Sequence, residues 1–361
     1  MRQYILVINP GSTSTKVAIF AGEKNIKQKD LSHSAEDISR FDRISDQYEY
    51  RKNAIFQWLR SEEITLASIV AVVGRGGLLR PMPSGTYIVT EPMLVDLKVG
   101  VQGEHASNLG GLIAKAIATA EGIPSFIVDP VAVDEFEDIA RISGLPELPR
   151  RSLVHALNIK AVARKVAKKL NKQLSETNFI VAHLGGGISI APLRYGKIID
   201  VNNANDGGPF SPERCGGIPV GELVNLAFSK QYTYKDLKKK MVGSGGLVGY
   251  LGTNDVREVV AMLEAGDKKA ELIHNAMGYQ IGKEIGACAA VLSGKVDRII
   301  LTGGIAYNSK LMAYIEDMVR FIAPVLVVPG EDEMQALAEG ALRIINKEEK
   351  AKVYEEEIEV E

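Results

Sequence analysis

Residues 4–20 read YILVINPGSTSTKVAIF, an apolar run that enters a turn of glycine and hydroxyl residues and returns as a second apolar run. Residues 179–193 read FIVAHLGGGISIAPL and repeat this order about half a chain later. Short β-prone runs bounded by glycine or proline are typical of buried strands, and a tight glycine turn joins two such strands as a hairpin. The sequence therefore predicts two copies of one strand–turn–strand element.

Helical patterns separate the other glycine-bounded apolar runs, for example at 108–121, 154–172 and 268–292. Strands that alternate with helices indicate α/β layers. We therefore predict a duplicated α/β fold, with an N-terminal domain at 1–150 and a C-terminal domain at 151–334. The Glu-rich stretch 347–361 predicts an exposed helix end or a frayed tail.

Composition excludes several classes of protein. The 361 residues have a formal net charge of -2, which argues against nucleic-acid binding by bulk charge, although a local basic patch stays possible. No apolar run reaches the ~18 residues of a membrane span, and the start lacks the pattern of a signal peptide. Two cysteines, Cys215 and Cys288, allow neither a disulfide framework nor a Cys-rich zinc site. We expect a cytoplasmic protein.

Three glycine-rich turns suit phosphate binding, although the sequence contains neither a P-loop nor a GxGxxG fingerprint. The first, at 9–16, carries an asparagine, four hydroxyls and a lysine, and its backbone N–H groups can form a phosphate nest. A polar hairpin turn explains this loop alone equally well. The second turn is at 185–187, and the third, at 302–306, precedes a helix. Together they predict phosphate held in an interdomain cleft.

These loops, in this order, resemble the phosphate-1, phosphate-2 and adenosine motifs of the acetate and sugar kinase, heat-shock-70 and actin superfamily. The closer resemblance is to the acetokinase family and its butyrate kinases, and it covers essentially the whole chain. The segments that carry it are 7–16, 74–81, 182–191 and 329–334. The resemblance implies two ribonuclease-H-like (actin-like ATPase) domains with an interdomain cleft, the first completed by a C-terminal helix at 335–361.

The resemblance also implies a phosphotransferase with a carboxyl group as acceptor. Such an enzyme moves a phosphoryl group reversibly, by direct in-line transfer, between ATP and butyrate, giving butyryl phosphate and ADP. It uses Mg²⁺ and forms a homodimer or larger homo-oligomer. Two alternatives stay open: a kinase for acetate, propionate or a branched acid such as isobutyrate, and an actin-like ATP-binding regulator without catalysis.

Site residues follow from the resemblance position by position. The predicted catalytic residues are Arg75, Asp129, His155 and Arg214. The predicted nucleotide-binding residues are Asn9, Ser12, Ser14, Lys16, His183, Gly185, Gly186, Gly187, Asp255, Arg257, Gly303 and Gly304. The predicted carboxylate-binding residues are Arg75, Gly77, His105 and Val154. Magnesium is assigned to Asn9 and Glu333, with the register among residues 331–333 open.

Other interpretations of these residues are structural. A strand-end aspartate such as Asp129 often caps a helix. His105, His155 and His183 lack the close spacing of a zinc site.

Acyl-chain preference is predicted from two positions. Acetate kinases typically have valine where this chain has Gly77, and phenylalanine where it has Val154. Both changes remove side-chain volume, so the sequence predicts a pocket for a four-carbon or branched acid. Each buried methylene contributes roughly 0.8 kcal/mol, so discrimination between neighbouring chain lengths is expected to be modest.

Overall fold

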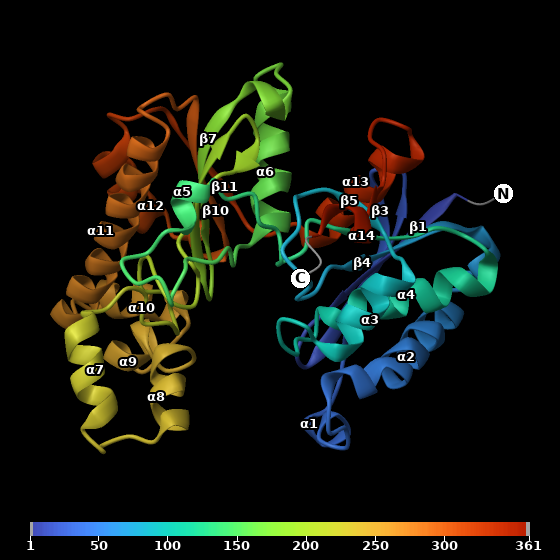
Figure 1. The fold of residues 1–361 in the computed structure, drawn as a ribbon, viewed down its shortest axis with the longest axis horizontal. Coiled ribbons are helices and arrows are strands. Elements are labelled where there is room, and N and C mark those ends of the chain that lie inside the picture. The colour runs from blue at the N-terminus through green and yellow to red at the C-terminus, as the bar shows by residue number, and fades with distance from the viewer. Residues whose placement is uncertain (1–2, 359–361) are drawn as a thin grey trace. The chain divides into compact units, whose positions relative to one another are not determined.

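The computed structural model describes residues 3–358, and its internal contacts divide the chain into two compact units. Unit 1 contains the residues up to Asp134 and those from Asp332 onward, and unit 2 contains Glu135–Glu331. Figure 1 shows both units as ribbons and labels many of their helices and strands. The domain boundaries expected from the sequence, at 150/151 and 334/335, stay a prediction.

Unit 1 is built on a seven-stranded sheet with the order β12-β5-β6-β4-β1-β2-β3. Its strands are β1 (Tyr4–Pro10), β2 (Ser14–Ala21), β3 (Lys24–Ser32), β4 (Ile69–Arg75), β5 (Thr86–Ile88), β6 (Ser125–Val128) and β12 (Lys352–Val353). Its helices are α1 (Ala35–Ile38), α2 (Tyr48–Ser61), α3 (Glu91–Val99), α4 (Asn108–Glu121), α13 (Glu333–Ile345) and α14 (Tyr354–Glu357). Helices α4 and α13 both pack on β1, β4 and β6, and Figure 1 shows them on either side of this sheet.

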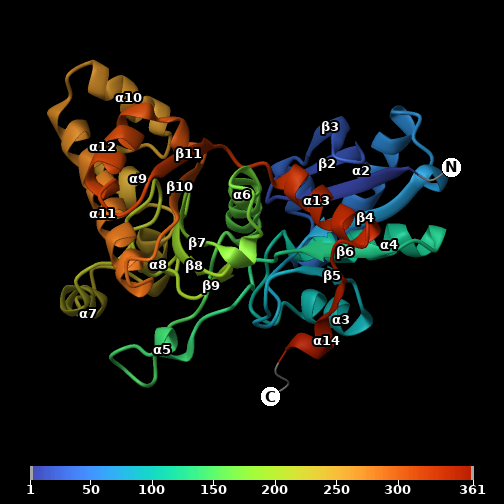
Figure 2. The ribbon, with the colours of Figure 1, turned by 90° about the horizontal axis from the view of Figure 1, so that it is seen from above.

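Unit 2 is built on a five-stranded sheet with the order β11-β10-β7-β8-β9. Its strands are β7 (Asn178–Leu184), β8 (Ile188–Arg194), β9 (Lys197–Ile198), β10 (Arg298–Gly303) and β11 (Val325–Pro329). Its helices are α5 (Asp138–Arg141), α6 (Ala156–Lys169), α7 (Val220–Phe228), α8 (Tyr234–Met241), α9 (Gly246–Leu251), α10 (Val256–Glu264), α11 (Lys268–Val291) and α12 (Ser309–Val319). Helices α6 and α11 pack on β7, as Figure 2 shows from above.

The predicted duplication is confirmed at the level of strand pairing. β1 and β2 form an antiparallel hairpin, and so do β7 and β8. The first strand of each hairpin also pairs in parallel with a later strand, β1 with β4 and β7 with β10. Residues 5–10 of β1 and 179–184 of β7 are all buried, because helices cover both faces of a sheet with parallel strands.

The segment after Ile345 differs from the predicted single helix at 335–361. Helix α13 ends there because Lys347 adopts a left-handed backbone with φ of 61°, and β12 and α14 follow. The segment is not a frayed tail either, because the Tyr354 ring is buried in the unit 1 core. Its hydroxyl donates to Asp96 Oδ2 over 2.7 Å. Residues 359–361 lie outside the described residues.

No helix among residues 3–358 combines the length and the apolar character needed to cross a membrane.

Candidate active site

Arg75, Asn9 and Glu333 meet at one edge of the unit 1 sheet. β1 and β4 are parallel and in register at Ile8 and Gly74, so Asn9 and Arg75 leave the sheet at the same edge. Glu333 begins α13, which packs on both strands. Arg75 Nη1 pairs with Glu333 Oε1, and Asn9 Nδ2 donates to Glu333 Oε2 over 2.7 Å. We call these three residues the Arg75 cluster.

The Arg75 cluster contains ligand types that a magnesium ion uses beside phosphate oxygens, and its carboxylate here pairs with Arg75 and accepts from Asn9. It offers one carboxylate and one asparagine amide, and Mg²⁺ commonly takes one or two protein carboxylates while keeping waters and phosphate ligands. Among residues 3–358, no group of three or more His, Cys, Asp or Glu side chains could hold a metal by itself. The acidic residue that the structure brings to Asn9 is Glu333.

Asp129 does not cap a helix. It follows β6, and the next helix begins at Asp138. Its side chain is buried, its Oδ1 accepts from Gly85 N–H over 2.8 Å, and its own N–H donates to Gly85 O over 2.9 Å. Its backbone is left-handed, with φ of 38°. A non-glycine residue in this region stores strain that surrounding contacts must hold, and such residues cluster at functional sites.

The loop between α3 and α4 positions His105. His105 Nδ1 accepts the Ser107 N–H over 3.2 Å, so in the neutral ring the proton lies on Nε2. Desolvation by the surrounding protein, and then the positive charge of Arg75, lower the pKa of His105. A neutral His105 therefore presents an Nε2–H donor.

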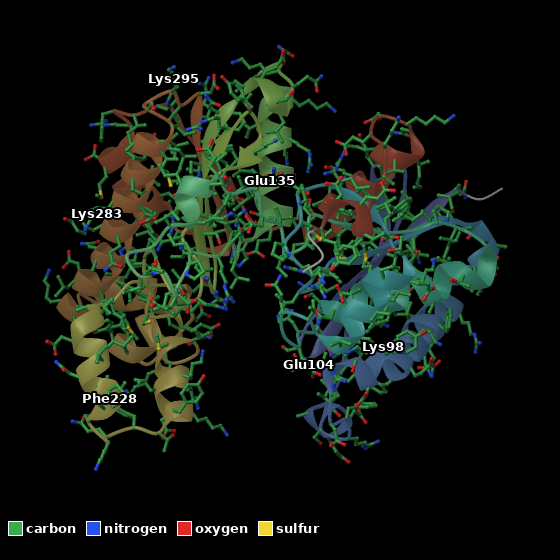
Figure 3. The ribbon with its side chains drawn as sticks, viewed as in Figure 1. Lys98, Glu104, Glu135, Phe228, Lys283 and Lys295 are labelled. Carbon is green, nitrogen blue, oxygen red and sulfur yellow. The ribbon has the colours of Figure 1, made fainter. Side chains whose placement is uncertain are left out.

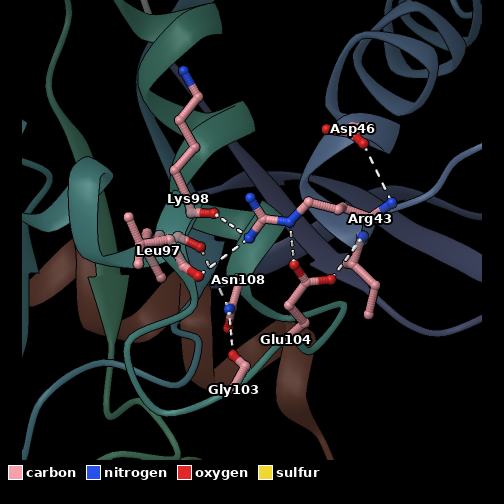
Figure 4. A network of polar contacts seen from close by, with 9 residues as sticks. Arg43, Asp46, Leu97, Lys98, Gly103, Glu104 and Asn108 are labelled. Carbon is pink, nitrogen blue, oxygen red and sulfur yellow. Dashed lines mark hydrogen bonds and ion pairs between the residues drawn. The ribbon is translucent and has the colours of Figure 1, made fainter.

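An ion pair between Arg43 and Glu104 anchors this loop, as Figure 4 shows. Arg43 Nε donates to Glu104 Oε1 over 2.5 Å, and Arg43 Nη2 donates to the carbonyl oxygens of Lys98 and Val99, each over 3.2 Å. Asn108 Nδ2 donates to Gly103 O over 3.1 Å, and Asn108 Oδ1 accepts the Leu78 N–H over 2.8 Å. Asn108 therefore links the loop that carries His105 to the one that follows Arg75.

The volume argument for Gly77 is wrong. A Cβ at Gly77 would lie 2.3 Å from Asn108 Oδ1 and 2.6 Å from Asn108 Cα, so that space is already filled. A Cβ at Gly76 would lie 2.4 Å from Pro130 Cβ, and one at Gly74 would lie 2.2 Å from Gly110 O. These glycines permit close packing against α4 and the loop after β6. A role of Gly77 in carboxylate binding stays a prediction, but its missing side chain creates no acyl pocket.

Gly77→Ala is therefore expected to destabilise the protein by about 1–3 kcal/mol, because the added methyl overlaps Asn108. Urea unfolding measures this loss. The matched control is Gly144→Ala, where an added Cβ meets no atom within 4 Å. The ratio of kcat/KM between acids of two and four carbons should not change in the folded Gly77→Ala enzyme. A large shift of that ratio toward the shorter acid would restore the pocket interpretation.

The first glycine-rich loop joins β1 to β2, with Ser12, Thr13 and Lys16 exposed. Thr15 lies behind it, fully buried, and its Oγ1 is 2.8 Å from His33 Nε2. Burial, and then the positive charge of Arg51, lower the pKa of His33 from 6.5 to about 4. His33 is therefore neutral at pH 7.

This shift predicts a loss of stability in mild acid. The pKa of His33 is lower in the folded state than in the unfolded state, so its contribution to stability is complete above pH 6.5 and is lost as the pH falls toward 4. The loss is on the order of 3 kcal/mol. Urea unfolding between pH 4 and pH 7 measures it, with His33→Gln as comparison. Parallel pH profiles of the two proteins would contradict the prediction.

In unit 2, the triple glycine forms the turn between β7 and β8. Ser211 Oγ donates to Gly186 O over 2.6 Å, and Gly185 N–H donates to Gly187 O over 3.1 Å. A Cβ at Gly187 would lie 2.4 Å from Arg214 Nη1 and 2.7 Å from Arg214 Cζ. The missing side chain at Gly187 therefore lets the Arg214 guanidinium approach this backbone, while phosphate binding by the turn stays a prediction.

Arg214 is held with part of its hydrogen-bonding capacity unused. Its Nη1 donates to Ala204 O over 3.1 Å. Its Nε is buried and has no hydrogen-bond partner in the described part of the chain. Burial lowers the pKa of the guanidinium, but an arginine stays protonated at neutral pH. A buried, unpartnered donor on a cation suits an anionic ligand.

His155 and His183 lie together, stacked with ring centroids 4.1 Å apart and an interplanar angle of 13°. His155 Nδ1 is 2.9 Å from Ser189 Oγ, and His183 Nδ1 is 2.9 Å from Asn158 Oδ1. His183 Nε2 is 3.2 Å from Glu331 Oε1. Val154 is buried next to His155. The predicted His155 and His183 are thus neighbours, while His105 belongs to unit 1.

The third loop contains one tightly packed and one open glycine. Gly303 has φ of 92°, and a Cβ there would lie 2.3 Å from Leu184 O. A Cβ at Gly304 would meet nothing within 4 Å, so the backbone there is open to a ligand.

Asp255 and Arg257 form a local pair. Asp255 caps α10 by accepting the Arg257 N–H over 2.8 Å, and its Oδ2 pairs with Arg257 Nη2 over 2.5 Å. Within residues 3–358, neither forms a hydrogen bond or an ion pair with any other predicted site residue.

Sequence reasoning missed several residues that organise these loops. Arg51 and Ser211 contact the glycine-rich turns, and Asn108 orders the loops around Arg75 and His105. A lone arginine or serine carries no local signal for such a role, because the contact forms only in the tertiary structure.

A model of the acetokinase family matches residues 147–355. The chain belongs to the acetokinase family. This acetokinase is 56% identical to Butyrate kinase 1 of Clostridium acetobutylicum over 97% of this chain and 99% of that protein. It is 54% identical to a probable butyrate kinase of Clostridium botulinum over 98% of this chain and 100% of that protein.

The fold of this acetokinase also matches a solved structure. The acetate kinase of Porphyromonas gingivalis superposes with a TM-score of 0.79, covering 95% of this chain and 100% of that one at 20% identity. At 20% identity, this structural similarity is evidence for a shared fold only. The predicted α/β fold of acetokinases, with two sheets, is confirmed.

Proposed function

We propose that this acetokinase transfers the γ-phosphoryl group of ATP to butyrate, reversibly, giving butyryl phosphate and ADP. The observation that carries the proposal is Arg214, a half-buried cation whose buried Nε donor is unused and whose guanidinium lies against the triple-glycine turn. Phosphoryl transfer needs such donors, because negative charge spreads over the oxygens of the moving group. The curated relatives over nearly the whole chain are named butyrate kinases, which supports butyrate as the acceptor.

The chemistry requires positioning and charge stabilisation more than proton transfer. A carboxylate is ionised at neutral pH, so no general base is needed. A carboxylate oxygen forms a bond to the γ-phosphorus while the bond from this phosphorus to the bridging oxygen breaks, and that electron pair leaves with ADP. In the proposed scheme Arg75 binds the carboxylate or the transferring phosphoryl group, and Arg214 stabilises the phosphoryl oxygens.

The remaining predicted residues have supporting roles in this proposal. Neutral His105 donates through Nε2–H, and His155 and His183 contact phosphoryl oxygens. Asn9 and Glu333 would hold magnesium, which neutralises phosphate charge when bound. The open turns at Ser12–Thr13 and Gly304 suit the nucleotide. Assembly into a homo-oligomer and a cytoplasmic location stay predictions from the sequence.

An acyl-hydroxamate assay with ATP tests the proposal. It compares kcat/KM for acetate, propionate, butyrate and isobutyrate, and we expect butyrate to give the highest value. A higher kcat/KM for acetate or for isobutyrate would mean that this acid, and not butyrate, is the preferred acceptor. Absence of an acyl phosphate with all four acids, despite ATP binding, would favour the ATP-binding regulator.

A further inference from the structure

Arg51 lies directly behind the first glycine-rich loop. It belongs to α2, is 1% exposed, and its guanidinium donates to three carbonyl oxygens of that loop. Arg51 Nη1 donates to Gly11 O over 2.8 Å and to Ser14 O over 2.9 Å, and Nη2 donates to Ser12 O over 3.0 Å. One side chain therefore determines the orientation of three peptide groups.

The remaining backbone contacts of the loop also point its carbonyl groups toward the protein. Thr13 O accepts the His33 N–H over 2.8 Å, so every carbonyl from Gly11 to Ser14 accepts a protein donor. Within residues 3–358, the N–H groups of Ser12 and Thr13 have no protein acceptor, and both residues are exposed. The loop thus directs its oxygens inward and leaves backbone donors for a ligand, which is the arrangement of an anion nest.

Side chains hold the guanidinium in place without neutralising it. Gln47 Oε1 accepts from Nε over 3.0 Å and from Nη2 over 2.8 Å, and Thr15 Oγ1 accepts from Nη1 over 3.1 Å. Because Thr15 Oγ1 accepts there, its proton can point to His33 Nε2, 2.8 Å away. In the described part of the chain, Arg51 forms no ion pair with a carboxylate. Its charge therefore reaches the loop and attracts an anion there.

We propose that Arg51 is a positioning residue for phosphate binding by residues 11–14. It holds the loop carbonyls away from the nucleotide phosphates and adds a buried positive charge behind the exposed N–H groups. The proposal deepens the proposed function and rests on it for the identity of the ligand. Arg51 acts through the loop, without contact to the reacting atoms.

The test is Mg-ATP binding and turnover by Arg51→Met and Arg51→Lys. We expect Arg51→Met to raise the dissociation constant of Mg-ATP at least tenfold and to lower kcat at least tenfold, with KM for butyrate changed less than threefold. Lysine keeps the charge but cannot reach all three carbonyls, so Arg51→Lys should give an intermediate effect, and it replaces Arg51→Met if that variant does not fold.

The control is Lys160→Met, which removes a buried cation of unit 2. Lys160 is 2% exposed, pairs with Glu135 over 2.6 Å and donates to Gly196 O over 2.6 Å (Glu135 is labelled in Figure 3). We expect it to lower the melting temperature while Mg-ATP binding stays within twofold of wild type. This comparison separates a general loss of stability from a loss of phosphate binding.

Two results would overturn the inference. One is an Arg51→Met protein whose melting temperature falls while its Mg-ATP dissociation constant and kcat stay within twofold of wild type. The other is a wild-type chain that does not bind Mg-ATP. If the wild type binds Mg-ATP but phosphorylates no carboxylate, the proposed function fails, and the binding comparison still decides the role of Arg51.

Discussion

Arg75→Ala is expected to lower kcat for butyryl phosphate formation by about 10²- to 10³-fold while the chain still folds. Removing one donor that stabilises developing charge has effects of this size, and an arginine beside a transferring phosphoryl group has larger ones. The fold should persist because Glu333 is still stabilised after Arg75 is removed. It still accepts the hydrogen bond from Asn9 Nδ2, and it lies in the first turn of α13, where a carboxylate is favoured.

The measurement is steady-state kinetics with a circular dichroism melt of the same preparation. Arg75→Lys keeps the charge but not the planar pair of donors, so it should recover only part of the activity. The matched control in unit 1 is Arg40→Ala, since Arg40 is exposed and pairs with Glu36 at the surface. An Arg75→Ala enzyme with wild-type kcat would refute the catalytic assignment of Arg75.

Gly187→Ala is expected to lower kcat nearly as far as Arg214→Ala does. The new Cβ would lie 2.4 Å from Arg214 Nη1, so the guanidinium must move. The clash involves the far end of a flexible side chain, so the backbone can stay in place and the protein should fold. The loss of activity then comes from the displacement of Arg214. This single substitution therefore tests whether the position of Arg214 matters for catalysis.

A double-mutant cycle makes this test specific. In an Arg214→Ala background the clash is absent, so Gly187→Ala should have little further effect on kcat. The control is Gly286→Ala, where an added Cβ meets nothing within 4 Å; this change inside α11 should stabilise the protein by about 0.5–1 kcal/mol. Independent, additive losses from Gly187→Ala and Arg214→Ala would contradict the proposed contact.

Local patterns predicted the two hairpins and the strand ends correctly. The apolar runs at 4–8 and 179–184 are strands, and their glycine turns lie where the sequence places them. Strand propensity and turn chemistry act over a few neighbouring residues, so a sequence displays them directly. The segment 335–361 was predicted less well, because its interruption at Lys347 and the burial of Tyr354 depend on packing against unit 1.

Glycines show most clearly what could not be predicted from the sequence alone. The sequence places glycines at positions 77 and 187; the resemblance implies an acyl pocket at Gly77, and the glycine-rich pattern predicts the approach of a ligand at Gly187. The structure shows Asn108 in the first space and the Arg214 guanidinium against the second. A missing side chain leaves room for whatever packs there, and sequence spacing does not identify the neighbour.

For this acetokinase, the sequence by itself determined the duplicated hairpins, the glycine-rich turns and the strand-end positions of Asn9 and Arg75, because these follow from local periodicity and turn chemistry. Tertiary structure alone decided which side chains complete those turns. Glu333 pairs with Arg75 across 258 positions, and Arg51 reaches the carbonyl of Gly11 from 40 positions away. Such contacts depend on how helices pack on the sheets, which no short stretch of sequence encodes.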